Sequence, residues 1–288
     1  MKPAPFRYHT PASIQECLDL LSEYNDDSVI LAGGQSLVAL LRFRMAQPEH
    51  VISLRDIREQ LAYIREGENS IVIGAGATYA VTQNSTIVKA RCPSLLSAIE
   101  LIASPAVRSR GTLCGSLCNA DPVSELPAMA LLLGINFRLR SRKGERVVSA
   151  EEFFVGPYTT SRQSDELLIE IVVPVQAPGE LVVIKEISRL QGGFAMAGIA
   201  IAITNGGSAA ERSARVVCFG ANPRQARAPK TEAELIKFGF TSEGIDAASI
   251  ALATEIEPQS DAFASKEYRR AASQELLKRA VEEALEAV

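Results

Sequence analysis

The sequence predicts an α/β protein of two domains, and three observations support this prediction. Short apolar, β-branched runs such as SVIL at residues 28–31 alternate with segments whose apolar residues recur at helical spacing. The stretch QAPGE at residues 176–180 follows Pro174 and is typical of a connector. Residues 273–288, SQELLKRAVEEALEAV, carry the pattern of an amphipathic helix. We therefore expect a first domain at 1–176 and a smaller second domain at 177–288.

Composition excludes several classes of function. The chain has 288 residues and a formal net charge of -4, so it has no basic field for nucleic acid or anionic membranes. No apolar run approaches a membrane span, and the N-terminal segment MKPAPFRYHTPAS has no signal-peptide core. Five widely spaced cysteines do not resemble a disulfide framework, and the two histidines lie in segments unlike metal sites. We expect a cytoplasmic protein.

The first sixty residues are expected to form a compact α/β unit. The segment SIQE at 13–16 predicts a capping box at the start of a helix. The run SVILAGG predicts a buried strand, the pattern SLVALLRFRM a helix, and HVISLRDI a second strand. This unit, about residues 1–60, is the first of two subdomains.

The second subdomain, about residues 61–176, begins with a strand that enters a glycine turn. This is SIVIGAGAT at 70–78, where Gly74 and Gly76 suggest a dinucleotide fingerprint. The third glycine of that fingerprint is absent because position 79 is Tyr79, so a strand-to-helix turn is favoured. A helix at 94–104, two strands around Lys143-Gly144 and a strand ending at Pro174 complete this subdomain.

The second domain is expected to contain three strands and the C-terminal helix. The strands are LVVIKEISR, FAMAGIAIAIT and SARVVCFGANP, and the helix is the segment 273–288. The apolar face of that helix is expected to belong to the core of this domain, with contact to a partner as the alternative.

Two small-residue segments carry the functional argument. The first is Ala32-Gly33-Gly34-Gln35-Ser36, where consecutive glycines permit close approach of the backbone to a ligand. Successive backbone N–H groups can form an anion-binding nest there. Ser36 either caps the helix that follows or donates its hydroxyl to a phosphate oxygen. The alternative is an ordinary strand-to-helix turn.

The second segment is a long loop of small residues, GTLCGSLCNADP at 111–122. Two such loops in one domain suggest an extended ligand with a central diphosphate, since a lone phosphate needs only one. Within the loop, Cys114 and Cys118 are interpreted as small filler residues, as a redox pair, or as half of a metal site. Scarce histidine disfavours the metal.

These segments, in this order, resemble the FAD-binding medium subunit of molybdenum hydroxylases, the family of xanthine dehydrogenase and carbon monoxide dehydrogenase flavoproteins. The resemblance covers nearly the whole chain, from MKPAPFRYHTPAS through AGGQSLVALLRFRMAQPEHVISL and VRSRGTLCGSLCNADPVSELPA to AEEFFVGPYTT and DELLIEIVVP. It implies a two-part FAD-binding domain of the vanillyl-alcohol-oxidase (PCMH) type, followed by a small C-terminal α/β domain of the CO dehydrogenase flavoprotein type. Non-covalent FAD would lie extended between the two parts, with its diphosphate on the glycine loops.

Matching positions to the family implies a set of FAD contacts. They are Ala32, Gly33, Gly34, Gln35 and Ser36 in the first loop, Thr112, Leu113, Cys114, Gly115 and Ser116 in the second, and the separate residues Ile102, Glu125, Leu168 and Lys185. Each separate residue has an ordinary alternative role: Ile102 and Leu168 in the core, Lys185 as a solvated strand residue, and Glu125 as a favourable charge at a helix start.

Three positions depart from the family pattern. The second loop has Cys114-Gly115 where the family has two glycines, Cys118 stands where alanine is common, and Glu125 is one methylene longer than the usual aspartate. The chain has no inserted cysteine-rich segment for an additional iron–sulfur cluster. The contact geometry at these three positions is therefore open.

The resemblance also implies partners and a division of labour. A large subunit would hold a molybdenum–pterin cofactor and hydroxylate the organic substrate, and a small subunit would carry two [2Fe-2S] clusters. Electrons would pass through those clusters to FAD on this chain and then to an external acceptor, such as NAD, oxygen, a quinone or a redox protein. A dimer of heterotrimers is the expected assembly. Because the large partner holds the substrate pocket, this chain predicts no particular substrate.

Two other functions remain as alternatives. A self-sufficient flavin oxidoreductase of the same fold would need its own acid/base residues and substrate pocket, and the sequence shows no convincing nucleophile–base pair. A scaffold subunit that has lost FAD would be favoured if the side chain of Cys114 pointed into the FAD channel.

Overall fold

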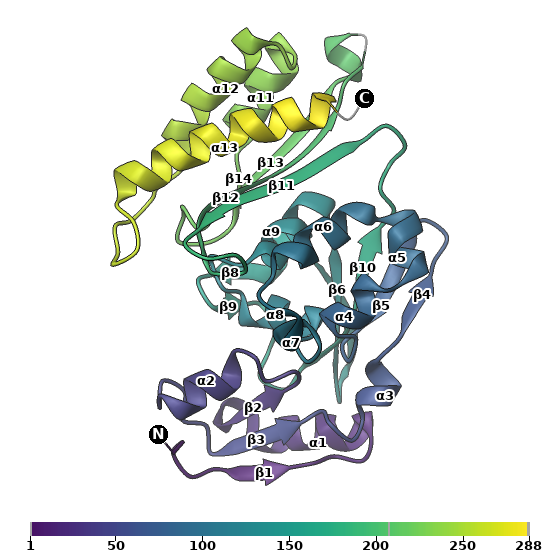
Figure 1. The fold of residues 1–288 in the computed structure, drawn as a ribbon. Helices are drawn as coiled ribbons and strands as arrows, with labels where there is room; N and C mark the ends of the chain where they lie inside the picture. Colours follow the sequence, from purple (N-terminus) through teal and green to yellow (C-terminus); the bar gives the residue numbers. More distant parts are fainter. Residues whose placement is uncertain (1, 207, 287–288) are drawn as a thin grey trace.

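The computed structural model describes residues 2–206 and 208–286 of the chain. Figure 1 shows three parts stacked along the long axis of the molecule. A small N-terminal unit lies at the bottom, a larger unit built around a sheet lies in the middle, and the C-terminal sheet with its helices lies on top. The order of helices and strands agrees with the α/β fold class expected from the sequence.

The N-terminal unit is a parallel sheet flanked by helices. The helix α1 (Ile14–Tyr24) begins where the hydroxyl of Ser13 accepts a hydrogen bond from the Glu16 N–H. The Glu16 carboxylate accepts from the Ala12 N–H, so the expected capping box is replaced by a bond one residue earlier. The strands of the sheet lie in the order β1 (Arg7–His9), β3 (His50–Ser53) and β2 (Ser28–Leu31). The 3-10 turn η1 (Asn25–Asp27) and the helix α2 (Leu37–Arg42) complete the unit.

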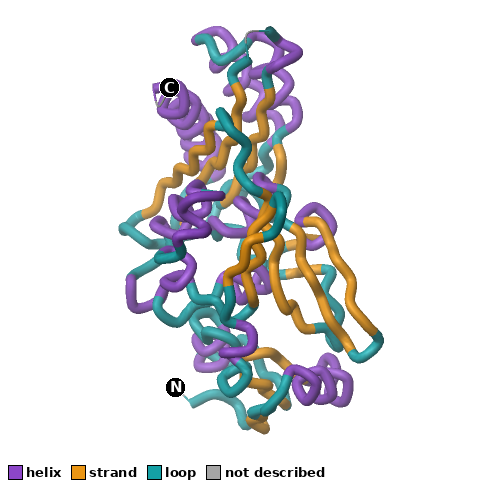
Figure 2. The backbone as a smooth tube through the Cα atoms, turned by 90° about the vertical axis from the view of Figure 1, so that its right-hand side faces the viewer, coloured by secondary structure: helices purple, strands orange, loops and turns teal. Residues whose placement is uncertain are grey.

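The middle unit contains a five-stranded antiparallel sheet, whose strands form the right-hand group in Figure 2. Its order is β4-β5-β10-β6-β7, with β4 (Ile64–Glu66), β5 (Ser70–Gly74), β10 (Leu167–Pro174), β6 (Asn136–Ser141) and β7 (Gly144–Ser149).

Eight helices and a hairpin accompany this sheet. They are α3 (Arg58–Leu61), α4 (Tyr79–Gln83), α5 (Thr86–Arg91), α6 (Pro93–Leu101), α7 (Pro105–Arg108), α8 (Leu113–Asn119), α9 (Glu125–Leu133), α10 (Ala150–Phe153) and the strands β8 (Phe154–Gly156) and β9 (Thr159–Thr160). The segment 113–119, expected as loop, is instead the helix α8. Its N-cap Thr112 accepts from the Gly115 N–H, and Leu113 and Leu117 bury its apolar side.

The C-terminal unit is a four-stranded antiparallel sheet under three helices. The strands are β11 (Leu181–Ser188), β12 (Ala195–Thr204), β13 (Ser213–Phe219) and β14 (Ala226–Arg227), in that order, and the 3-10 turn η2 (Ala209–Glu211) precedes β13. The helices are α11 (Pro229–Phe238), α12 (Ser242–Glu255) and α13 (Lys266–Glu286). The last helix begins earlier than expected, and Ala287 and Val288 lie outside the described residues.

Both faces of the C-terminal sheet are covered. On β12, Ile199 and Ile201 face the core under the three helices, whereas Ala200 and Ala202 face the core of the middle unit. The helix α9 packs on that second face, and all nine of its residues are buried. The apolar face of α13 is internal, because Leu276, Leu277, Ala280 and Val281 are buried against the sheet, as expected from the sequence.

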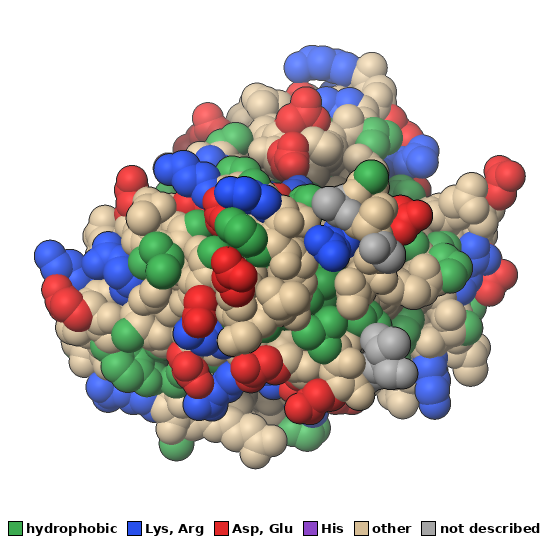
Figure 3. Space-filling view, turned by 90° about the horizontal axis from the view of Figure 1, so that it is seen from above, with side chains coloured by type: hydrophobic (Ala, Val, Ile, Leu, Met, Phe, Trp, Pro, Cys, Tyr) green, Lys and Arg blue, Asp and Glu red, His purple; other side chains and the backbone are tan. Residues whose placement is uncertain are grey.

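The outer surface of the C-terminal unit is mixed in charge. Figure 3, a view from above, shows acidic and basic side chains interspersed on this face. Exposed pairs such as Lys278–Asp246 and Arg279–Glu275 contribute to it. Among the described residues, no helix combines the length and hydropathy that a membrane span requires.

Candidate functional site

The two small-residue segments meet at one cavity between the N-terminal and middle units. The cavity has a volume of about 410 Å³. Its wall includes Ala32, Gly33, Gly34, Gln35 and Ser36 from the first segment, and Thr112, Cys114, Gly115 and Ser116 from the second. Strand β10 contributes Leu168, so ten of the fourteen residues expected at the FAD site lie around one cavity.

Two glycines of the first segment are required by the backbone. A Cβ atom added to Gly33 would lie 2.3 Å from the carbonyl oxygen of Arg110 and 2.8 Å from the Cα of Gly111. Gly34 has φ +74°, a conformation that other residues rarely adopt. The two segments therefore touch backbone to backbone, and the absence of side chains is what allows them to form one wall.

Ser36 occupies the N-cap position of α2, but its hydroxyl makes no capping hydrogen bond. The sequence left two roles for Ser36, a helix cap or a donor to a phosphate oxygen, and the structure does not show the capping hydrogen bond. Thr112 differs, because its hydroxyl accepts a hydrogen bond from the Gly115 N–H at 3.1 Å. Ser36 thus presents a hydroxyl at the cavity that can donate to a phosphate oxygen, whereas Thr112 uses its hydroxyl within the fold.

This difference predicts opposite results for two matched substitutions. We expect Ser36→Ala to weaken FAD binding several-fold, through loss of one hydrogen bond of about 1 kcal/mol, with Tm unchanged. We expect Thr112→Ala to lower stability by about 1 kcal/mol through loss of the α8 cap. Fluorescence titration with FAD and thermal unfolding measure the two effects. A Ser36→Ala protein that lost stability but kept its FAD affinity would show that the serine has a structural role.

Two expected contacts lie in the protein interior. The side chain of Leu113 is fully buried, and its N–H donates to the Ala77 carbonyl, so neither group faces the cavity. Ile102 follows α6 as its C-cap residue and is only 8% exposed, outside the cavity wall. Its carbonyl and that of Ala103 accept hydrogen bonds from Arg108, which fixes this turn.

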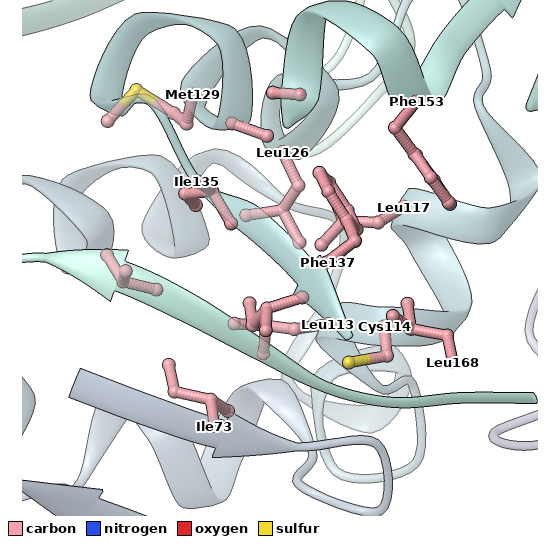
Figure 4. Packing of buried hydrophobic residues seen from close by; sticks show 14 of the residues in the cluster. Ile73, Leu113, Cys114, Leu117, Leu126, Met129, Ile135, Phe137, Phe153 and Leu168 are labelled. Atoms are coloured by element: carbon pink, nitrogen blue, oxygen red, sulfur yellow. The ribbon is translucent and has the colours of Figure 1, made fainter. Parts of the chain in front are cut away.

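The side chain of Cys114 packs in the core and does not fill the cavity. It is 3% exposed, and Figure 4 shows it among the buried apolar side chains of this unit. Burial raises the pKa of this thiol well above its usual value, and it raises the pKa of Cys118 to about 11. Neither thiol is therefore activated for redox chemistry. Within residues 2–206 and 208–286, no group of three or more His, Cys, Asp or Glu side chains is arranged to hold a metal ion.

We expect Cys114→Gly to retain FAD. The substitution removes a small core side chain and introduces glycine into α8, so we expect a loss of about 1–2 kcal/mol of stability. Flavin absorbance per folded chain and denaturant unfolding separate the two effects. Loss of flavin from a folded Cys114→Gly chain would give the thiol a role in binding.

The last two expected contacts lie near the C-terminal sheet. Glu125 begins α9 and is 8% exposed, and burial raises its pKa to about 7. Lys185 lies on the face of β11 under the helices, where its ammonium pairs with Glu283 of α13. The structure therefore directs the Lys185 side chain away from the middle unit. Its neighbour Glu186 faces that unit instead.

Several cavity residues were not expected from the sequence. Tyr79 begins α4 and lines the wall. The β8–β9 hairpin brings Tyr158, and the segment after it brings Arg162, which is fixed by bonds to the Gln163 and Glu166 carbonyls. In the sequence, Tyr79 was noted only because it replaces the third glycine of a dinucleotide-binding fingerprint. The hairpin residues reach the cavity only through long-range folding.

A second cavity of about 850 Å³ adjoins the first across the segment 32–35. Four arginines line it: Arg42, Arg55, Arg58 and Arg110. Its wall, as far as the described residues show, contains no carboxylate. The first glycine segment is thus flanked by positive charge, which favours an anionic ligand at its backbone N–H groups.

Comparison with protein families assigns both parts of the chain. Residues 4–176 match the FAD binding domain in molybdopterin dehydrogenase, and residues 183–284 match the CO dehydrogenase flavoprotein C-terminal domain. The chain belongs to the FAD-subunit family of molybdenum hydroxylases. It is accordingly a subunit of an oxidoreductase, and its cofactor is FAD.

Members of this family are similar over their whole lengths. The carbon monoxide dehydrogenase medium chain of Hydrogenophaga pseudoflava is 35% identical over 98% of this chain and 97% of its own length. The nicotine 6-hydroxylase medium subunit of Paenarthrobacter nicotinovorans is 35% identical over 99% of both chains.

Solved structures show the same fold. A chain of carbon monoxide dehydrogenase from Hydrogenophaga pseudoflava superimposes with a TM-score of 0.94, at 36% identity and 99% coverage of both chains. A chain of quinoline 2-oxidoreductase from Pseudomonas putida 86 gives a TM-score of 0.92, at 30% identity, and covers 100% of this chain and 99% of that chain.

The residues around the first cavity fit FAD. The bare backbone at Gly33 and Gly34 permits close approach of a diphosphate, and Ser36 offers a hydroxyl beside it. Apolar side chains from α2 and β10, including Leu40 and Leu168, supply surface for the flat parts of the cofactor. The family assignment and the chemistry of the cavity therefore agree.

Proposed function

We propose that this chain is the FAD-carrying electron-transfer subunit of a molybdenum-containing hydroxylase or dehydrogenase complex. It accepts electrons from [2Fe-2S] clusters of a small partner and passes them to an external acceptor. The observation that carries the proposal is the backbone contact between Gly33 of the first small-residue segment and Arg110 and Gly111 at the start of the second. This contact forms a cavity wall that suits a diphosphate. Similarity to medium chains of carbon monoxide dehydrogenase and nicotine 6-hydroxylase supports it.

The residues of this chain bind and orient the cofactor. Backbone N–H groups of residues 32–36 hold the diphosphate, with Ser36 as an added donor. Ile102, Leu113, Cys114 and Leu168 contribute to the apolar packing on which this site rests. FAD supplies chemistry that no side chain has, namely the exchange of electrons singly or in pairs.

The described cavity wall lacks the side chains that most often act as general acids or bases. The wall of the first cavity, within the described residues, contains no histidine, aspartate or glutamate. This composition suits a subunit whose organic substrate is bound elsewhere in a complex. It favours the electron-transfer role over the self-sufficient flavin enzyme.

The proposal includes partners and domain limits. A large subunit with a molybdenum–pterin cofactor and a small subunit with two [2Fe-2S] clusters complete the complex, as a dimer of heterotrimers. The FAD-binding domain spans residues 1–176, with subdomains at about 1–60 and 61–176, and the C-terminal domain spans 177–288.

Absorption spectroscopy tests the proposal. The purified chain is mixed with FAD, desalted, and its visible spectrum is recorded before and after denaturation. We expect a retained flavin spectrum and release of free FAD on denaturation. Co-purification with the large and small subunits, followed by bleaching of the flavin band when substrate is added, tests electron transfer. A folded chain that keeps no flavin, alone or in the complex, would overturn the proposal.

A further inference from the structure

The loop at residues 220–225, which joins β13 to β14, is bound to the end of the second small-residue segment. The Gly220 N–H donates to the Pro122 carbonyl at 3.0 Å. The Gln225 side-chain amide donates to the Asp121 carbonyl. Gln225 is only 1% exposed, so the fold shields this bond from water. Two neighbouring carbonyls of the middle unit thus receive their donors from the C-terminal unit.

The residue before this contact has a strained backbone. Ala120 is the C-cap of α8, with φ +47° and ψ +43°. This left-handed conformation is unfavourable for a residue with a Cβ atom, and glycine is the residue that usually adopts it at the end of a helix. Contacts from outside the segment must therefore hold Ala120 in place.

A second strained residue is bonded to the first. Tyr158, in the β8–β9 hairpin, has φ +52°, and its N–H donates to the Ala120 carbonyl at 3.0 Å. The Arg224 guanidinium donates to the carbonyl of Phe154, the first residue of the hairpin, at 3.0 Å. Figure 1 shows the hairpin beside α8 and below the C-terminal sheet. The loop 220–225 therefore contacts both the second segment and the hairpin that is bonded to it.

The loop is itself fixed on the side of the C-terminal unit. The Arg269 guanidinium of α13 donates to the Gly220 carbonyl at 2.6 Å. The Asn222 side-chain oxygen accepts a hydrogen bond from the Glu257 N–H at 2.7 Å. A loop that is bonded on both sides can hold one unit against the other.

Both strained residues belong to elements that line the first cavity. The wall includes Tyr158 itself and, from α8, Cys118 and Asn119, which come directly before Ala120. No described residue of the C-terminal unit lines this cavity. The C-terminal unit can therefore act on the cavity only through the elements that it holds in place.

We propose that Gln225 is a positioning residue for FAD. Its amide holds the Asp121 carbonyl, so that Ala120 keeps its left-handed conformation and both α8 and the β8–β9 hairpin keep their places in the cavity wall. The inference rests on the proposed binding of FAD in this cavity and adds a residue that does not touch the cofactor. A wall that is already in its binding conformation gives tighter binding, because less ordering has to accompany association.

Hydrogen–deuterium exchange of the chain without FAD tests the positioning directly. Gln225→Met keeps the length of the side chain but removes its donor. We expect faster amide exchange in peptides covering residues 113–124 and 154–160 than in the wild type, because these segments open more often. Gln274→Met is the matched control, since the Gln274 amide donates to the Ser249 carbonyl at 3.0 Å and joins α13 to α12 within the C-terminal unit. It should leave the exchange of both peptides unchanged. Equal exchange in Gln225→Met and the wild type would overturn the proposal.

The second measurement follows the cofactor. Fluorescence titration with FAD is carried out well below the Tm of each protein. We expect Gln225→Met to weaken FAD binding by about fivefold, and Gln274→Met to leave it unchanged, although each loses one hydrogen bond. An equal loss of affinity in both variants would mean that general destabilisation, and not positioning, is the cause.

Arg224→Ala keeps the proposal testable if Gln225→Met does not fold. Arg224 is exposed, and its substitution removes the bond to the Phe154 carbonyl. We expect faster exchange at residues 154–160 and a smaller loss of FAD affinity than in Gln225→Met. An unchanged affinity in every folded variant of this loop would contradict the proposal. A wild-type chain that binds no FAD would instead count against the proposed function, and the exchange measurement would still decide whether Gln225 holds the segment.

Discussion

We expect the variant Gly33→Ala to lose at least tenfold in FAD affinity, which corresponds to about 1.4 kcal/mol. The added Cβ atom would lie 2.3 Å from the Arg110 carbonyl oxygen and 2.8 Å from the Gly111 Cα. Both atoms belong to the backbone, so no side chain can rotate away, and the two segments must separate. Gly33→Asp adds negative charge next to the diphosphate and should abolish retention of FAD. Gly34→Asp should do the same, since φ is +74° at Gly34.

The matched control is Gly156→Ala on β8. A Cβ atom there would meet its nearest neighbour, the Cβ of Thr159, at 3.7 Å, an ordinary contact. Both variants are purified with FAD, desalted, and compared by flavin absorbance per folded chain, with circular dichroism to confirm folding. If folded Gly33→Ala retained as much flavin as Gly156→Ala, the segment 32–36 would not be the diphosphate site.

Replacing Arg269 by alanine is expected to cost about 3 kcal/mol of unfolding free energy. This residue of α13 is 5% exposed, and its guanidinium donates to the carbonyls of Met196 and Gly220 and to Asp261. These bonds join α13 to the beginning of β12 and to the residue that follows β13. The substitution leaves two carbonyl oxygens without a donor and creates a void, so Tm should fall by about 6–10 °C.

Arg279→Ala is the control for this prediction. Arg279 is on the same helix, is 64% exposed and pairs with Glu275 four residues earlier. Such an exposed pair contributes about 0.5 kcal/mol or less, so Tm should change by no more than about 2 °C. Thermal unfolding by circular dichroism compares the two proteins. Equal shifts in both would mean that Arg269 does not hold the helix to the sheet.

Sequence patterns were sufficient to predict the first strand and the glycine segment that follows it. The residues SVILAGG predicted the strand and the glycine segment, because paired glycines after an apolar run have few other uses. The second segment was recognised as ligand-lining, but its helix α8 was missed. Cysteine, glycine, serine and asparagine are poor helix formers, and this helix depends on the Thr112 cap and on tertiary burial of Leu113 and Leu117.

The C-terminal contacts show what a pattern cannot decide. In LVVIKEIS both faces of β11 are apolar, because both are covered, so the sequence does not indicate which of Lys185 and Glu186 faces the FAD-binding unit. Register with β12 decides it, and that information is distributed over the second domain. Tyr158 and Arg162 were missed for a related reason, since the hairpin that brings them to the cavity is positioned by long-range packing.

The complete burial of α9 has a consequence for truncation. Every residue of Glu125–Leu133 is covered, in part by the C-terminal sheet, although this helix belongs to the segment matched by the FAD-binding family. A gene fragment that stops at the connector would expose that apolar helix to water, and its product would be prone to aggregate during expression. The two halves recognised as separate families are therefore not interchangeable modules in this chain. We therefore expect each half to depend on the other for stability when single domains are expressed, when domains are exchanged between relatives, or when the connector is cleaved by a protease.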